Sequence, residues 1–528
     1  FGTLIGCAPG QDQLTADLLG RTHERPIEGL DVRVRQRTPL SFDDGNCTVD
    51  LVGDALLVTG SPDQIHLVEQ TVQMLSACVG APITLRAAAF HLEQGGDLPV
   101  LAPDYDALRA RLAELGAVFE WEGTTIAASE QKAELGVRRS SQYVMDFEVE
   151  IAQSSTMSNP VPSPIHLGSR VVVKAHALTG TSDVVLVAQY ARGEEVAPVR
   201  GVPLGKDKQL PRIEVPSVAI DFGTMSGRVP SGGALLALAE GVWAGRRYGL
   251  IVGAQRTAPP PELERELGAF PLGAFLDGAL REPVSRPLAD LEEASDPFHG
   301  DARWSPPLGV ASDWSGQIDP AGEAAWEVLL RQALGEEDAT VELFDDVAWV
   351  QGSPAAKQTV GRLIEQLQDQ FLRTVEVECR LDAEPNRPAI HRLRHPVLLG
   401  RHHVAVHGVE TTSIVDFDVE VAQKAGIADP KVVRQFTGTE FLVQAFPMPP
   451  QDLGAKAEVR TVQTVPARTF VPETEHGLPI DQPVITQVRH RHFGRIPQDG
   501  VVRFGSGPEV LLDQRPVATR QSLAIRAR

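Results

Sequence analysis

The sequence predicts an α+β fold in which small β-α-β units alternate with sets of antiparallel strands, arranged as two tandem copies. Two observations carry this prediction. The segment DFEVEIAQ at 146–153 returns as DFDVEVAQ at 416–423, with six of eight positions identical. The segment VTGSP at 58–62, which leads into a helical pattern, returns as VQGSP at 350–354. Segments that return in the same order are typical of a duplicated module.

The repeated octapeptide predicts a strand with one dry and one wet face, because apolar and acidic residues alternate along it. We expect its apolar side chains to face a packed sheet and its acidic side chains to face water. The landmark residues of the two strands are Asp146, Phe147, Glu148, Val149, Glu150 and Ile151, and Asp416, Phe417, Asp418, Val419, Glu420 and Val421.

Residues 1–47 form a lead-in segment, and 48–93 are expected to form the first β-α-β unit. Ser61 can cap the helix of this unit, Pro62 suits its first position, and Gln64 completes a capping box. The helix is predicted at 62–78 and the strands at 49–52, 55–59 and 83–92.

Residues 94–253 are expected to form the first β domain. It begins with a predicted helix at 104–116, because Leu108, Leu112 and Leu115 lie on one side of it. Short strands separated by Gly or Pro are predicted at 170–178, 184–192, 215–224 and 235–239.

A turn forms a third landmark and closes each copy. It contains Pro230, Gly232 and Gly233 in the first copy, and Pro497 and Gly500 in the second. The offset between corresponding residues falls from 292 at the helix start to 270 at the octapeptide and 267 at this turn. The second copy is therefore 22 residues shorter between the first two landmarks, where the first copy has its helix at 104–116.

The copies are joined by a segment rich in Pro and Gly, which is typical of a linker. A helix is expected at 321–334, where alanine and leucine recur every four residues. The predicted order is a linker at 254–304, a connecting helix region at 305–338, a second β-α-β unit at 339–384, a degenerate second β domain at 385–510 and a C-terminal tail at 511–528.

Composition excludes several functions. A formal net charge of −21 argues against nucleic acid as a partner, since phosphate binding requires clustered Lys and Arg. No run of 18 apolar residues is present, so no helical membrane span is predicted. The segment GVPLGKD at 201–207 is one residue short of a phosphate loop and has Asp where Ser or Thr would hold magnesium. We predict no cofactor and no catalytic residue.

A histidine-rich stretch lacks the HExxH spacing of a metal site, and strand alternation sends neighbouring histidines to opposite faces. We therefore predict no metal. The stretch RHRH at 489–492 is interpreted as a basic face that meets an acidic neighbour. The histidines are His391, His395, His402, His403 and His407.

Cysteines give two hypotheses. Leu4-Ile5-Gly6-Cys7 fits the pattern of a bacterial lipoprotein cleavage site, which would attach a lipid to Cys7. Cys47 and Cys78 flank one helical segment, and both counterparts in the second copy are other residues. Their joint absence favours a disulfide in an oxidising compartment, and two buried free thiols are the alternative.

Taken in order, these segments resemble those of bacterial secretins, the family of outer-membrane ring channels of type II and III secretion and type IV pili. The resemblance rests on the β-α-β unit with its VTGSP turn, the strand YVMDFEVEIAQ, the strand pair at 171–187 and the turn and strand VPSGGALLAL. It covers about 45–253 well and about 339–510 in degenerate form. The segment 120–137 lacks the Pro and the Asn-Gly turn that secretins commonly carry there.

The resemblance implies a homo-oligomeric ring of a bacterial cell envelope, in the outer membrane or the periplasm. Sheets of neighbouring subunits would join into a β-barrel or ring, with the β-α-β units stacked below. Partners would be further copies of the chain and other envelope or secretion components, and membrane contact would use the barrel or a lipid anchor. In a ring, Glu148, Glu150, Asp418 and Glu420 would line the lumen and favour cations. The alternative is a structural or adhesive cell-surface repeat protein with no pore.

Overall fold

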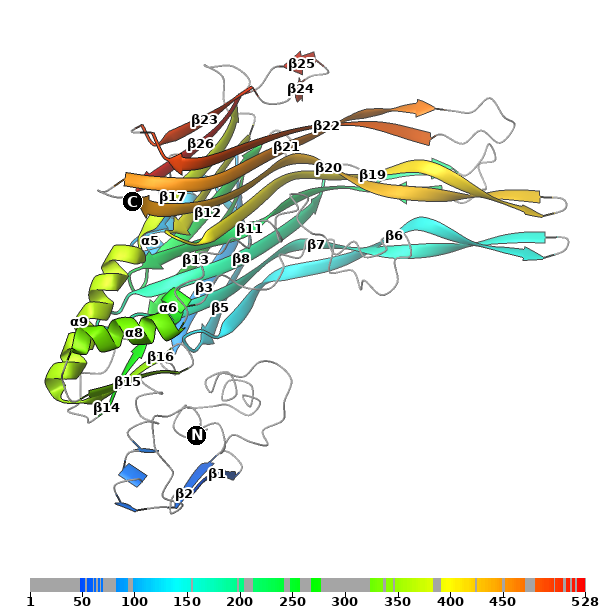
Figure 1. Ribbon diagram of the computed structural model, residues 1–528. Coiled ribbons are helices and arrows are strands. Elements are labelled where there is room, and N and C mark those ends of the chain that lie inside the picture. Colours follow the sequence, from blue (N-terminus) through cyan, green and yellow to red (C-terminus); the bar gives the residue numbers. More distant parts are fainter. Residues whose placement is uncertain are drawn as a thin grey trace.

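The fold consists mostly of antiparallel β-sheet with few helices (Figure 1). Among the described residues, no helix is long and apolar enough to cross a membrane. The computed structural model describes residues 48–52, 55–59, 61–62, 65–66, 68–69, 82–93, 98–152, 155–196, 199–203, 212–241, 247–256, 267–276, 323–335, 339–344, 347–382, 391–422, 425–448, 452–470, 480–497, 499–506, 510–512, 515–517 and 520–527.

One large sheet, called here the long-strand sheet, has eight strands, and several of them extend far beyond the rest as hairpins (Figure 1). Every neighbouring pair in it is antiparallel. In spatial order the strands are β22 (Ile480–Arg495), β21 (Asp452–Phe470), β20 (Ala425–Met448), β19 (His402–Ala422), β11 (Ser217–Val229), β8 (Val184–Glu195), β7 (Ser155–Ala177) and β6 (Lys132–Ala152).

The second large sheet, the short-strand sheet, has nine strands. One of them, β4 (Leu101–Ala102), pairs with β12 beside the main path. Along that path the order is β23 (Val501–Ser506), β26 (Arg520–Ala527), β17 (Thr374–Asp382), β18 (His391–Leu398), β12 (Ala234–Gly241), β13 (Arg247–Arg256), β3 (Ile83–Leu92) and β5 (Val118–Ala127).

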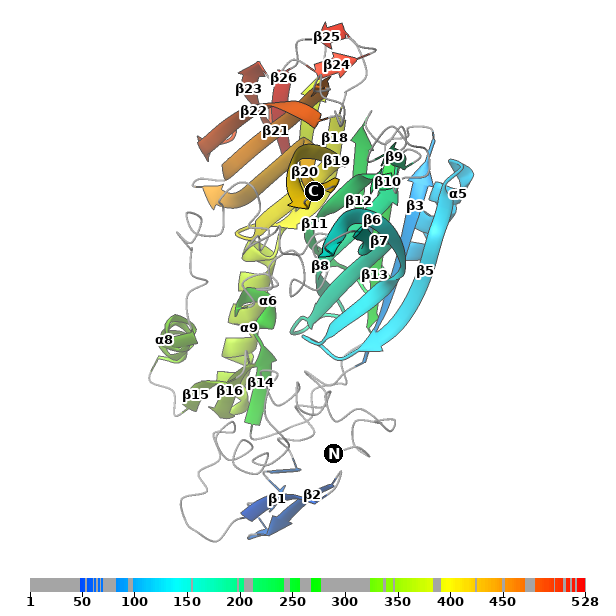
Figure 2. The ribbon, with the colours of Figure 1, turned by 90° about the vertical axis from the view of Figure 1, so that its right-hand side faces the viewer.

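The two large sheets pack face to face around two separate apolar cores. The first core joins strands between 83 and 254, and includes Leu85 of the short-strand sheet and Val173 of the long-strand sheet. The second joins strands between 375 and 525 together with Ala239, and includes Val377 and Val443. Figure 2 shows the two halves side by side, with the earlier strands in blue and green and the later strands in yellow to red. Each core follows from the alternation of apolar residues along the facing strands.

Smaller elements complete the chain. Helix α5 (Tyr105–Glu114) packs Leu108 and Leu112 onto the short-strand sheet. Helices α8 (Glu323–Leu334) and α9 (Pro354–Phe371) share an apolar cluster with a three-stranded sheet. That sheet has the order β14 (Leu267–Pro271), β16 (Val347–Gly352) and β15 (Ala339–Phe344), and the other elements are α6 (Gly273–Leu276) and the pairs β1 (Thr48–Val52) with β2 (Ala55–Thr59), β9 (Arg200–Pro203) with β10 (Arg212–Val215), and β24 (Val510–Leu512) with β25 (Arg515–Val517).

Several predicted elements are confirmed. The strands at 55–59 and 83–92 have the predicted bounds. The helix predicted at 104–116 is α5, and Asp104 caps it by accepting a hydrogen bond from the backbone of Ala107 at 2.9 Å. The helix predicted at 321–334 is α8.

Other boundaries differ from the prediction. The strand that follows each helix, β3 or β17, was assigned to the small β-α-β unit, but it pairs with strands of the short-strand sheet. The predicted linker at 254–304 contains β14 and α6. The predicted tail at 511–528 contains β26, which lies between β17 and β23. Sequence periodicity identifies β3 but not its partners, because pairing depends on distant segments. β14 and β26 were not predicted as strands.

Candidate functional site

Each large sheet ends in an edge strand on both sides. The long-strand sheet ends at β6 and β22, and the short-strand sheet ends at β5 and β23. Within the described residues, each of these four strands hydrogen-bonds to one neighbouring strand only. Residues 136–140 of β6 are all exposed, and Val137 keeps 56% of its surface open. Exposed strand edges of this kind are templates for pairing with another chain.

Both sheets cross between the two halves of the chain at one place, called here the central junction. In the long-strand sheet, 217–223 of β11 pair with 405–411 of β19. In the short-strand sheet, 238–241 of β12 pair with 391–394 of β18. The central junction therefore joins one half to the other through both layers.

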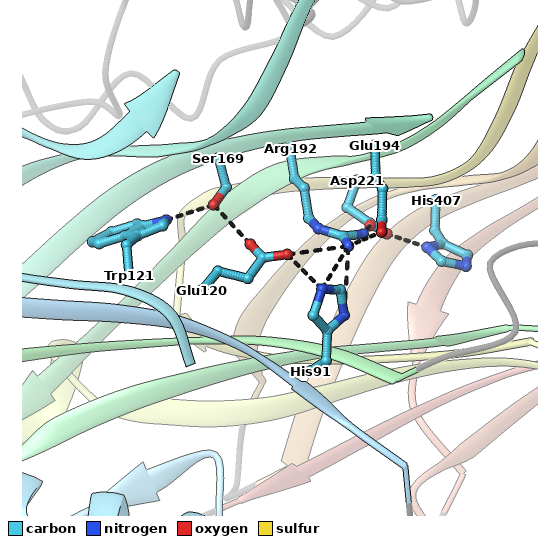
Figure 3. Close-up of polar contacts among 8 residues, drawn as sticks. All are labelled: His91, Glu120, Trp121, Ser169, Arg192, Glu194, Asp221 and His407. Atoms are coloured by element: carbon cyan, nitrogen blue, oxygen red, sulfur yellow. Dashed lines mark hydrogen bonds and ion pairs between the residues drawn. The ribbon is translucent and has the colours of Figure 1, made fainter. Parts of the chain in front are cut away.

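A buried charge cluster lies at the central junction (Figure 3). Asp221 of β11 and His407 of β19 are Cα partners, and Nδ1 of His407 hydrogen-bonds the Asp221 carboxylate. Arg192 of β8 donates from Nη1 to that carboxylate at 3.1 Å. Asp221, His407 and Arg192 are 0%, 1% and 2% exposed. Burial acts to raise the pKa of the Asp221 carboxyl, but the charges and hydrogen bonds of His407 and Arg192 outweigh burial and lower it.

The cluster continues into the short-strand sheet. Nη2 of Arg192 lies 3.4 Å from Glu120 of β5, and Nε2 of His91 on β3 lies 2.5 Å from the same carboxylate. The Ser169 hydroxyl of β7 donates to Glu120 at 3.2 Å and accepts from the indole of Trp121 at 2.5 Å. Figure 3 shows these side chains pointing toward one another from both sheets. The cluster therefore ties the two layers together beside the central junction.

Sequence reasoning missed this cluster. Arg192 and Asp221 are charged residues within strands that are otherwise mostly apolar, VVLVAQYAR and SVAIDFG. A buried charge is strongly destabilising unless it is paired, so an isolated charge in an apolar strand indicates a buried partner. That signal was present, but the partner His407 lies far away in the sequence.

Histidines line the interior of the central junction. Two pairs of rings are in contact between the sheets: His391 stacks on His407 at 4.4 Å, and His395 lies tilted against His403 at 4.8 Å between ring centroids. Burial lowers the pKa of His395 to about 4 and brings those of His391 and His403 well below the usual value. The neighbouring His402 is only partly buried, as strand alternation predicts. Within the described residues, no group of three or more potential ligands could hold a metal ion.

The basic stretch at 489–492 meets an acidic neighbour. Both Arg489 and Arg491 donate to the buried carboxylate of Glu458 on the adjacent strand β21, Arg491 at 2.7 Å. This confirms the interpretation of the stretch as a basic face against an acidic partner.

The two octapeptides lie in corresponding hairpins. The first begins in β6 opposite β7, and the second in β19 opposite β20. Each hairpin has a β-bulge directly before its octapeptide, between Val144 and Asp146 in one and between Ile414 and Asp416 in the other. The side chain of Phe147 is buried, and the side chains of 148–151 and 417–421 lie outside the described part.

The two closing turns also correspond. Gly233 donates its backbone N–H to Pro230 at 2.8 Å, and Gly500 donates to Pro497 at 2.8 Å. Gly232 and Gly500 have positive φ angles of 89° and 72°, which favour glycine. Each turn connects a strand of the long-strand sheet to one of the short-strand sheet, β11 to β12 and β22 to β23.

Three of the four cysteines, Cys7, Cys47 and Cys78, lie outside the described residues. The lipid on Cys7 and the disulfide between Cys47 and Cys78 therefore stay predictions. The fourth, Cys379, is a free buried thiol in the second core, where burial raises its pKa to about 12.

No protein-family model and no curated protein matches the chain. Among solved structures, the chain is similar to the InvG secretin domain β-barrel of the Salmonella SPI-1 injectisome, with 13% identity over 46% of this chain and 86% of that chain and a TM-score of 0.24. It is also similar to the secretin GspD of ETEC in complex with the pilotin AspS, with 11% identity over 48% of this chain and 67% of that chain and a TM-score of 0.22. A third similar structure is the type IV competence pilus secretin PilQ of V. cholerae, with 9% identity over 40% of this chain and 69% of that chain and a TM-score of 0.19.

Proposed function

We propose that the chain is a secretin-like subunit of a homo-oligomeric ring or pore in a bacterial cell envelope, where it acts as a channel or structural ring without catalysis. One observation carries the proposal. Both large sheets are open on both sides, and both already continue from one half of the chain to the other through the central junction. Sheets of this kind grow by adding further copies side by side, and closing them into a ring removes all exposed edges.

The proposal includes a tandem duplication, so that one chain supplies two neighbouring wall units. A wall unit is the set of four strands in the long-strand sheet and four strands in the short-strand sheet that one half of the chain contributes. Strand order supports it. Each half contributes four consecutive strands to the path of each large sheet, β11-β8-β7-β6 and β12-β13-β3-β5 in the first half, β22-β21-β20-β19 and β23-β26-β17-β18 in the second. When the strands of each half are numbered along the chain, strands with the same number occupy the same place in the sheet in both halves.

Register supports the duplication independently. Asp146 pairs with Val161 after the first bulge, and Asp416 pairs with Lys431 after the second, so both partners are shifted by 270 positions. Ile83 pairs with Ala127 and Val375 pairs with Val397, which are shifted by 292 and 270 positions.

Core composition gives a third line of support. Residues at equivalent ladder positions, with offsets between 267 and 292, occupy the two apolar cores even where their identities differ. These pairs are Ile83 and Val375, Val173 and Val443, Ala175 and Ala445, Ala188 and Ala457, Leu235 and Val502, and Val252 and Leu523.

The second copy is degenerate in this account. It connects β17 to β18 through 383–390 only, where the first copy places α5 between β3 and β5. The small sheet with α8 and α9 would correspond to a ring-building unit that stacks next to the wall. The lipid on Cys7, the disulfide between Cys47 and Cys78, contact with other envelope components and an acidic lumen lining belong to the same proposal.

Light scattering on the purified full chain tests the proposed function. A ring predicts a discrete mass many times 57.0 kDa, which persists in mild detergent and on dilution. A mass of 57.0 kDa across detergents and concentrations would contradict the ring and favour the structural or adhesive repeat protein, whose sheets would end at the edges of one chain.

A further inference from the structure

We propose that β22 pairs with β6 of a second copy of the chain, in the register that brings Val488 opposite Val137. This inference rests on the proposed ring and specifies its interface.

The central junction is the template for this pairing. β22 corresponds to β11 at an offset of 267, because Pro497 follows Pro230 by that number across equivalent turns. β6 corresponds to β19 at an offset of 270, as the two bulges require. The edge strands β22 and β6 therefore correspond to β11 and β19, the two strands that pair at the central junction. Within one chain, β22 and β6 do not pair with each other.

Transferring the register gives a defined ladder between two copies. Adding 267 to 217–223 of β11 gives 484–490 of β22, and subtracting 270 from 405–411 of β19 gives 135–141 of β6. The ladder thus runs antiparallel, with 484 opposite 141 and 490 opposite 135. Residues 136–140 are exposed in one chain, although 405–408 and 410, in the corresponding strand, are buried at the central junction.

One pair of this ladder is apolar on both sides. Val488 and Val137 occupy the positions that Asp221 and His407 occupy at the central junction, so an apolar pair replaces the charged pair. One residue beyond the ladder, Arg491 faces Glu134, and both are largely exposed in one chain. The two pairs lie on opposite faces of the sheet because they are three positions apart. Apolar pairs and opposite-charge pairs that lie directly opposite one another are both favourable cross-strand arrangements.

The two pairs also specify which edges can meet. If β11 paired with β6 of another chain, Asp221 would lie opposite Val137 and lose His407 as its buried partner. Asp221 would keep Arg192 but lose one of its two buried partners, so this exchange is disfavoured. We therefore expect β11 to pair with β19 of its own chain and β22 to pair with β6 of the next chain.

The short-strand sheet supports the same direction of assembly. By the same offsets, β23 corresponds to β12 and β5 corresponds to β18, so β23 is expected to lie beside β5 of the next chain. Both are edge strands, and β5 exposes Val118 and Ile126. Both sheets therefore end in a strand of the second half on one side, β22 or β23, and in a strand of the first half on the other side, β6 or β5.

Disulfide trapping in the full chain tests the register. Opposite residues of an antiparallel pair have Cα atoms about 4.5–5.5 Å apart, within the range that a disulfide spans. We expect the double variant Val488→Cys/Val137→Cys, oxidised after assembly, to form a covalent ladder at multiples of 57.0 kDa. The matched control is Val488→Cys/Arg138→Cys, because a shift of one residue turns the side chain to the opposite face. The natural chain and both single variants give the background from native thiols.

Mass measured on the same samples separates the outcomes. A ladder with the first pair that exceeds the control at least tenfold, in particles of many chains, supports the interface. Particles of many chains in which the control pair links as well or better would overturn the register but leave the ring intact. Particles of a single chain would overturn both the ring and the interface.

Discussion

At the residue scale, the central junction is held by charges that water does not reach. Asp221, His407 and Arg192 are buried between two apolar cores, where an ion is tolerated only with close partners. The cluster contacts both sheets through Glu120 and Ser169, so it fixes their relative position as well as the pairing of β11 with β19. We interpret the cluster as a structural lock, by which we mean a set of buried ion pairs that holds the two halves together.

Removing one charge tests this lock. Asp221→Ala leaves Arg192 and His407 without their shared carboxylate, and we expect a loss of about 3 kcal/mol. Thermal unfolding should show an apparent Tm lower by about 3 °C, because the unfolding entropy of a cooperative unit of 528 residues is about 1 kcal/mol/K. Asp106→Ala is the control, because it removes an exposed carboxylate that also accepts two hydrogen bonds from an arginine, Arg86. A similar Tm for both variants would contradict the lock.

Acid should weaken the central junction. His395 is fully buried beside Tyr190, His403 and Phe441, and its pKa of about 4 lies below the value near 6.5 of an unfolded histidine. The unfolded chain therefore binds more protons between these values, and stability falls as the pH falls from about 6.5 to about 4, by up to about 3 kcal/mol from this residue. Asp221, whose pKa is lowered, acts in the same direction because it also loses its stabilising charge in acid.

Melting temperatures measured between pH 7.5 and pH 4.5 check this dependence. His395→Gln, which cannot titrate, should have a shallower slope than the natural chain. The exposed His66→Gln should keep the natural slope. An unchanged slope for His395→Gln would show that another group controls acid stability.

At the element scale, the equivalent hairpins and turns are the most informative units. The octapeptide predicted a strand from its alternation, and each copy begins at a β-bulge that alternation cannot reveal. A bulge inserts one unpaired residue and alters the local twist. Both hairpins have this irregularity at the same place relative to the octapeptide.

The closing turns give a prediction for glycine. Gly232 has φ of 89° and open space around a built Cβ, so Gly232→Ala should cost about 1 kcal/mol through backbone strain alone. Gly500→Ala should cost more, because its Cβ would also approach the carbonyl oxygen of Ile525 at 3.0 Å. Gly201→Ala is the control, since it has only an ordinary contact at 3.5 Å. Urea unfolding measures the order, which would be contradicted if Gly201→Ala were the most destabilising.

Local signals in the sequence predicted elements well and their neighbours poorly. Asp104 and the leucines after it identified α5, and the alternating residues at 83–92 identified β3. The assignment of β3 to the small β-α-β unit failed to find its partners β13 and β5, because the pairing of β3 with β13 joins segments some 160 residues apart. β26 was not predicted as a strand. The charge cluster joins residues of six strands, which no local window contains.

At the scale of the whole molecule, each half of the chain contributes four strands to the path of each large sheet, and each sheet has an open edge on either side. In the proposed ring, each half forms one unit of the wall. The central junction is internal and charged, and the proposed junction between chains is apolar at the equivalent position. A ring built this way has two kinds of junction in alternation. It also has twice as many wall units as chains.

Single-particle imaging of the purified full chain, combined with its mass, tests this account most directly. The account predicts closed rings whose end views contain an even number of wall units, equal to twice the particle mass divided by 57.0 kDa. Particles that contain only two wall units with free edges, at every concentration and in every detergent that preserves the fold, would contradict it.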